Sequence, residues 1–206
     1  MPLETWFAFF AAAWLISLSP GPGALSCMAA GQRHGFRRAC WNILGLQLGV
    51  MFLVSVVALG LGAVLVASTT LFEAIKWAGA AYLVWLGIQQ WRAEPQALQV
   101  AATADGRRRQ LVLRGFLVNA SNPKGIVFML AVLPQFIDPA LPAWPQYLTC
   151  AVTLFFTDAV VMSGYTLLAA RVLRLLREPA QQRLANRVFG GLFVVAGLTL
   201  AGFRRT

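Results

Sequence analysis

The chain has 206 residues, of which 59% are hydrophobic and only 12% charged, and its net charge is +10. An ordinary soluble domain carries about 25% charged residues. This composition argues against a soluble enzyme, a disordered chain or a coiled coil, and it favours an all-α integral membrane protein. The positive charge leaves two alternatives, a nucleic-acid partner or basic loops beside a membrane, which the positions of the charges distinguish.

Six apolar stretches follow one another along the chain. A helix needs about 20 mostly apolar residues to cross the hydrocarbon core. The stretches are residues 5–32, 39–67, 71–91, 115–137, 145–170 and 188–203, the last starting a turn earlier if Leu184 is included. We therefore predict six transmembrane helices. The first stretch has no basic segment before it and is too long for a signal peptide, so we expect no cleavage.

Basic residues gather in alternate loops. Three loops that share one side of a six-span topology hold 13 of them: Arg33, Arg37, Arg38, Arg92, Arg107, Arg108, Arg109, Arg114, Arg171, Arg174, Arg177, Arg183 and Arg187. The other side holds three, Lys76, Arg204 and Arg205. The positive-inside rule then places the three loops in the cytoplasm and both termini outside. This asymmetry accounts for the charge without nucleic acid. Arg107–Arg109 could also contact anionic lipid headgroups, although setting the orientation is the simpler role.

The two halves of the chain resemble each other. The polar stretch 93–113 separates residues 1–92 from residues 114–206, with three apolar stretches in each. Ser19–Gly23 recurs as Ser121–Gly125, and Lys76–Tyr82 recurs as Arg187–Phe193. Because each half has an odd number of spans, the halves insert in opposite orientations. We predict one membrane domain built as a 3+3 inverted repeat, with a cytoplasmic linker at 93–113.

Proline and glycine interrupt the first helix and its counterpart, the fourth. The first carries Ser19, Pro20, Gly21, Pro22 and Gly23. Proline breaks or kinks a helix, and glycine permits unusual backbone angles, so we predict a short unwound segment. A packing kink without substrate contact is the alternative. Interrupted spans at matching positions in two halves indicate a transporter site.

The fourth helix carries Asn119, Asn122, Pro123 and Lys124 within an apolar span. A helix that restarts after Pro123 would present its N-terminal amides and the positive end of its dipole, which favour a carboxylate. Lys124 would add a full positive charge.

Three further polar residues lie in other spans. Asp158 is the one acid of the fifth helix, and an acid inside a membrane is a candidate proton carrier. Tyr165 lies seven residues later on the same helix face, and Gln47 of the second helix could line the pathway. Gly45 and Gly49 indicate close helix packing. Lys124 and Asp158 could hold the carboxylate and ammonium of an amino acid, Asp158 could exchange a proton, or the two could form a static pair.

The sequence contains none of the common catalytic signatures, and its three cysteines and single histidine lack metal-ligand spacing. We expect a secondary transporter rather than an enzyme, with no cofactor and no metal. Two alternatives stay open, a passive channel and an integral-membrane enzyme acting on a lipid-linked substrate.

Several motifs resemble those of the lysine exporter/homoserine-threonine resistance (LysE/RhtB) superfamily. They are Ser17–Gly23, Gly45–Gly49, Lys76–Gly87, Asn119–Lys124 and Leu133–Ile137, and the likeness extends over residues 4–203. The closest likeness is to the homoserine/homoserine lactone exporter branch. Pro22 is a departure, because close relatives often have a small polar residue there.

The resemblance implies a bacterial inner-membrane exporter of small amino acids or derivatives, such as homoserine, homoserine lactone or threonine, driven by the proton-motive force. Both termini would then be periplasmic. We expect the substrate site to include Ser19, Pro20, Gly21, Pro22, Gly23, Gln47, Asn119, Asn122, Pro123, Lys124 and Tyr165, with Asp158 coupling protons. A homodimer is expected only as the commonest closed arrangement.

Overall fold

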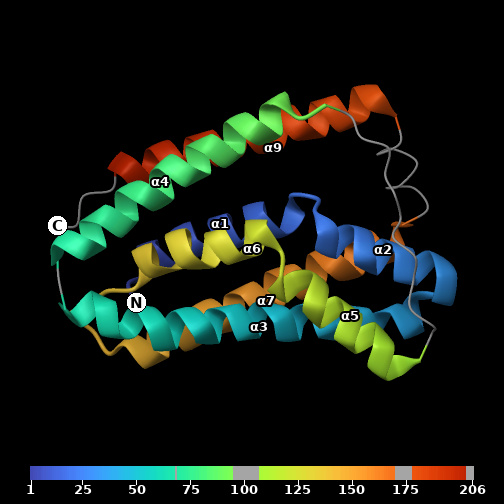
Figure 1. The fold of residues 1–206 in the computed structure, drawn as a ribbon, viewed down its shortest axis with the longest axis horizontal. Coiled ribbons are helices and arrows are strands. Elements are labelled where there is room, and N and C mark those ends of the chain that lie inside the picture. Colours follow the sequence, from blue (N-terminus) through green and yellow to red (C-terminus); the bar gives the residue numbers. More distant parts are fainter. Residues whose placement is uncertain (68, 95–106, 170–177, 203–206) are drawn as a thin grey trace.

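The computed structural model describes residues 1–67, 69–94, 107–169 and 178–202, and every regular element in these ranges is helical. Most helices run roughly along the long axis of the molecule, and the N-terminus and the end of α9 lie at the same end (Figure 1). In chain order the elements are α1 (Leu3–Leu18), α2 (Pro22–His34), α3 (Phe36–Ala67), α4 (Thr69–Arg92), α5 (Arg108–Ala120), α6 (Pro123–Val127), the π-helical turn η1 (Phe128–Val132), the 3-10 turn η2 (Leu133–Phe136), α7 (Ala143–Leu167) and α9 (Pro179–Gly202).

Among the described residues, two helices are long and apolar enough to cross a membrane, Phe36–Gly60 of α3 and Ala143–Leu167 of α7. Two bent pairs raise the number to four if each pair forms one span, namely α1 with α2 and α5 with the segment from α6 to η2. The structure therefore supports a helical membrane protein. Six spans remain a prediction, because α4 and α9 are not among these candidates.

Both breaks fall where proline and glycine predicted them. The chain bends by 56° between α1 and α2 and by 54° between α5 and the segment Pro123–Phe136. Each new helix starts with proline at its first position, Pro22 after Gly21 and Pro123 after Asn122, where the missing N–H costs no hydrogen bond. The glycines of the first break do not serve the purpose we expected. Gly21 has extended backbone angles that any residue adopts, and the positive φ in the described chain is at Gly35, which ends α2.

Helices that are distant in the sequence pack against one another. α3 packs along α5, while α7 packs along α1, α2 and α3. α4 and α9 lie against each other over most of their length (Figure 1). The close packing predicted at Gly45 and Gly49 is confirmed, since a Cβ at Gly45 would overlap the Val112 backbone and one at Gly49 would lie 2.8 Å from the Asn119 Cβ.

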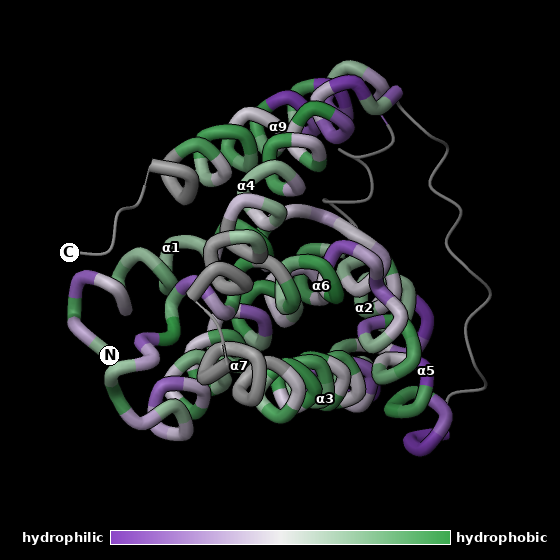
Figure 2. Tube along the Cα trace, turned by 60° about the vertical axis from the view of Figure 1, so that its left-hand side comes forward, coloured by the Kyte–Doolittle hydropathy of each residue, from purple (hydrophilic) through white to green (hydrophobic). Residues whose placement is uncertain are grey.

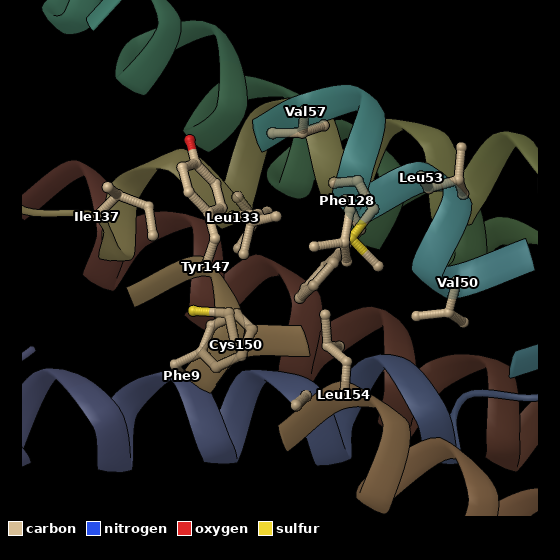
Figure 3. Packing of buried hydrophobic residues seen from close by; sticks show 14 of the residues in the cluster. Phe9, Val50, Leu53, Val57, Phe128, Leu133, Ile137, Tyr147, Cys150 and Leu154 are labelled. Atoms are coloured by element: carbon tan, nitrogen blue, oxygen red, sulfur yellow. The ribbon is translucent and has the colours of Figure 1, made fainter. Parts of the chain in front are cut away.

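A buried apolar cluster holds the breaks in place. It joins side chains of α1, α3, α4, η1, η2, α7 and α9, including Phe9, Leu53, Phe128, Leu133 and Leu154 (Figure 3). Because one cluster joins six separate parts of the chain, it fixes the broken helices relative to the helices around them.

Several connections between helices lie toward the same end of the molecule. The junction of α2 and α3, the end of α4 and the beginnings of α5 and α9 lie toward this end (Figure 1), and the beginnings of α5 and α9 are hydrophilic (Figure 2). Of the linker predicted at 93–113, residues 95–106 lie outside the described residues and 108–113 already belong to α5. Arg171, Arg174 and Arg177 likewise lie outside them, as do Arg204 and Arg205, and the side chain of Lys76 is not described.

Candidate functional site

The two helix breaks line one small cavity in the middle of the fold. Its volume is about 60 Å³, which is room for a few water molecules at roughly 10–15 Å³ each. The polar and small residues around it come from both halves: Ser17, Ser19, Gly21, Gly23, Asn119, Asn122, Lys124, Gly125 and Asp158. The breaks predicted from sequence therefore belong to a single site.

Lys124 closes the end of α1 from the opposite half of the chain. Its ammonium donates to the Ser19 carbonyl oxygen at 2.7 Å and lies 5.8 Å from the centre of the Phe193 ring. The last carbonyls of a helix lack partners within that helix. The Tyr165 hydroxyl donates to a second of them, that of Leu18, at 2.5 Å. The open end of α1 is thus held by one cation and one hydroxyl.

Asp158 has a different partner. Gln47, which is only 2% exposed, donates its Nε2 to Asp158 Oδ2 at 2.7 Å. Among the described residues no ion pair joins Lys124 to Asp158, although both line the cavity. The static pair considered from sequence is therefore not the arrangement in this structure. The cavity holds a cation and an acid that have separate neutral partners.

The two asparagines of the second break shape its backbone. The Asn122 side chain accepts from the Lys124 backbone N–H at 3.2 Å, which caps the first turn of α6. Asn119 donates from Nδ2 to the Leu46 carbonyl of α3 at 2.8 Å. A Cβ at Gly23 would lie 3.4 Å from Leu46 and 4.0 Å from the Asn119 amide oxygen. Gly23 therefore lines this side of the cavity at a position where a methyl group would make ordinary contacts.

Two buried polar atoms beside the cavity have no hydrogen-bond partner in the described structure, the Ser19 hydroxyl and the Gln47 amide oxygen. A buried polar group left without a partner costs about 1–3 kcal/mol. Such groups are rare in folded proteins and call for a functional or solvent explanation. Of the two, Ser19 lines the cavity, so its hydroxyl is available to a molecule that enters the site.

Of the residues predicted for the site, Ser19, Gly21, Gly23, Asn119, Asn122, Lys124 and Asp158 line the cavity. Gln47 contacts the site by donating a hydrogen bond to Asp158, and Tyr165 by donating one to the Leu18 carbonyl at the end of α1. Pro20, Pro22 and Pro123 are not among the lining residues; Pro22 and Pro123 begin the helices that follow the breaks.

Sequence analysis missed the apolar walls, formed by Ile16, Leu46, Val50, Phe128, Met129, Leu154 and Met162, and the ring of Phe193 near Lys124. No sequence pattern could have identified them, because an apolar residue in an apolar helix cannot be told from a residue of the hydrophobic core. In the described chain, no group of three His, Cys, Asp or Glu side chains is arranged to hold a metal ion.

Bent helix pairs around a charged cavity, together with long apolar helices, define the class of helical membrane transporters. The chain belongs to the LysE type translocator family, whose match covers residues 14–202. Family and relatives indicate a transporter rather than an enzyme.

The chain is 45% identical over 205 residues to the homoserine/homoserine lactone efflux protein of Salmonella typhimurium, and the alignment covers 99% of both chains. It is 40% identical over 201 residues to an uncharacterized membrane protein of Vibrio cholerae, covering 98% of both. A leucine efflux protein of an Enterobacter species is 28% identical over 97% of this chain and 95% of its own. No solved structure matches the chain.

Proposed function

We propose that this protein exports small amino acids or derivatives, such as homoserine, homoserine lactone or threonine, in exchange for protons. The observation that carries the proposal is the cavity between the two breaks, where Lys124 and Asp158 stand as separate opposite charges. The names of the Salmonella and Enterobacter relatives support efflux of amino acids and related molecules.

The charges suit a zwitterion. Lys124 would bind the substrate carboxylate, leaving the Ser19 carbonyl that it contacts in this structure. Asp158 would bind the substrate ammonium or carry the proton, with Gln47 holding its carboxylate in place. An acid inside a membrane span is costly, and proton relay is one of its usual roles. A single carboxylate that binds either a proton or an ammonium would couple the two movements, because it cannot hold both.

Export requires the cavity to open. A volume of about 60 Å³ is far below the ~300–1,000 Å³ typical of ligand sites, so this structure corresponds to a closed conformation in our scheme. We infer that the halves 1–92 and 114–206 form the 3+3 inverted repeat and move against each other, with six spans. The pairing of α4 with α9, and of α3 and α7 with the broken helix of the other half, supports that symmetry.

In a bacterial inner membrane, the basic end would face the cytoplasm and both termini the periplasm. Arg33, Arg37, Arg38 and Arg92 and the beginnings of α5 and α9 support this orientation by the positive-inside rule. A cysteine added before α1 would then react with an impermeant thiol reagent from the periplasmic side of intact cells. Labelling from the cytoplasmic side alone would reverse the orientation.

The deciding experiment uses inside-out proteoliposomes with an acid interior and labelled homoserine, threonine, lysine and homoserine lactone. We expect accumulation of at least one neutral or polar substrate, which a protonophore abolishes. Equilibration without accumulation would support the passive channel. Failure of every substrate with correctly folded and oriented protein would contradict the proposed substrate class, and chemical conversion of an added lipid-linked substrate would favour the enzyme.

A further inference from the structure

A groove on the outer face of α3 and α5 is not explained by transport. It is lined by Trp41, Leu48, Arg108, Arg109, Val112, Leu113 and Phe116, and its volume is about 440 Å³. We call it the arginine groove. It shares no lining residue with the cavity, to which the same two helices contribute Leu46 and Asn119.

The groove follows from the close contact of its two helices. Gly45 of α3 and Gly115 of α5 have no side chains, so each backbone touches the other, with a Cβ at Gly45 only 2.9 Å from the Phe116 nitrogen. The side chains next to these glycines form the walls of the groove on both sides of the contact between the two helices. Leu48 and Leu113 remain 46% and 53% exposed, which is costly in water and favourable against lipid chains.

The end of the groove at the start of α5 is positively charged. Arg108 and Arg109 are exposed, and the Arg108 guanidinium lies 5.2 Å from the centre of the Trp41 ring. In the described part of the chain neither arginine has an acidic partner. The aromatic contact orients Arg108 without neutralising it. Guanidinium groups bind phosphate oxygens through paired hydrogen bonds, and tryptophan favours the headgroup level of a membrane.

We propose that the arginine groove binds one anionic phospholipid of the leaflet at the basic end of the molecule. Its phosphate contacts Arg108 and Arg109, and an acyl chain follows Leu48, Leu113 and Phe116. The distance along α3 from Trp41 to Leu48 is about 10 Å at 1.5 Å per residue, enough for the upper part of a chain. A free phosphate would use only the arginines, whereas the apolar walls require a tail. This inference rests on the membrane location and is independent of the exported substrate.

The test is a lipid titration of the purified full-length protein in detergent, with bound lipid counted by native mass spectrometry. The probes are phosphatidylglycerol, phosphatidylcholine with the same chains, and glycerol 3-phosphate, which has no chains. The double variant Arg108→Gln/Arg109→Gln should bind phosphatidylglycerol about twenty-five-fold more weakly, from about fivefold for each arginine near a membrane surface. The matched control is Arg183→Gln/Arg187→Gln, which removes two exposed charges from α9 at the same end.

Wild-type protein and the α9 control should retain phosphatidylglycerol more strongly than phosphatidylcholine. Leu113→Ala, which leaves both arginines in place, should weaken retention of the chain-bearing lipid only. Equal losses in the two double variants would show diffuse attraction to the basic end and overturn the site. Equal binding of glycerol 3-phosphate and phosphatidylglycerol would show a simple anion site, and equal retention of the two lipids would refute charge recognition.

Discussion

The contact between α3 and α5 is so close that one methyl group should disrupt it. Gly45→Ala adds a Cβ that would overlap the Val112 carbonyl oxygen and lie 2.8 Å from its carbonyl carbon. It would also lie 2.9 Å from the Phe116 nitrogen, whereas ordinary contacts begin at 3.4 Å, and because the overlap with the Val112 oxygen is larger still, the helices must separate by about 1 Å or more. The atoms in the way are backbone of a packed helix, which cannot move aside as a side chain can.

Two effects of opposite sign determine the size of the change. Alanine is favoured over glycine inside a helix by about 1 kcal/mol. Overpacking typically costs about 1–3 kcal/mol, and a backbone clash belongs at the upper end. We therefore expect Gly45→Ala to lower the free energy of unfolding by about 2 kcal/mol, the difference between about 3 and about 1. For a chain of this size that is roughly 4–8 °C in apparent Tm.

The assay is thermal unfolding of the purified protein in detergent, followed by tryptophan fluorescence. Gly60→Ala is the matched control, because it lies on the same helix and has nothing within 4 Å of an added Cβ. It should leave the apparent Tm unchanged or raise it. If Gly45→Ala melts at or above the temperature of Gly60→Ala, the close contact of α3 with α5 is wrong.

Three site variants give further tests. Lys124→Ala should lower kcat/KM for homoserine in proteoliposomes by about tenfold or more, as expected for a lost charge-assisted hydrogen bond. It should affect the lactone less, because the lactone has no free carboxylate. Equal losses for the two substrates would make Lys124 structural. Asp158→Asn should abolish gradient-driven accumulation and flatten the pH profile of transport, and an unchanged profile would remove Asp158 from proton coupling. Ser19→Ala should raise the free energy of unfolding by about 1 kcal/mol, because it removes a buried hydroxyl without a partner, and it should weaken substrate binding. The two effects are measured by Tm and by substrate titration. A fall in both stability and binding would indicate a purely structural hydroxyl.

The sequence by itself determined the class of protein and the places where its helices break. A chain with 12% charged residues cannot cover a soluble surface, so a membrane location follows from composition. Pro22 and Pro123 lack a backbone donor and fit the first position of a helix, which marks each restart locally. Lys124 and Asp158 stood out because charges are rare and costly in apolar spans.

Only the tertiary structure decided what those residues contact. Lys124 binds the Ser19 carbonyl, and Asp158 binds Gln47, across 105 and 111 residues of sequence. Such pairings depend on how four helical segments pack, and residue spacing along one helix contains no information about them. The apolar walls of the cavity and the arginine groove were hidden for the same reason. In a chain where nearly every helix face is apolar, only packing decides which leucine or phenylalanine meets the cavity, the core or the lipid.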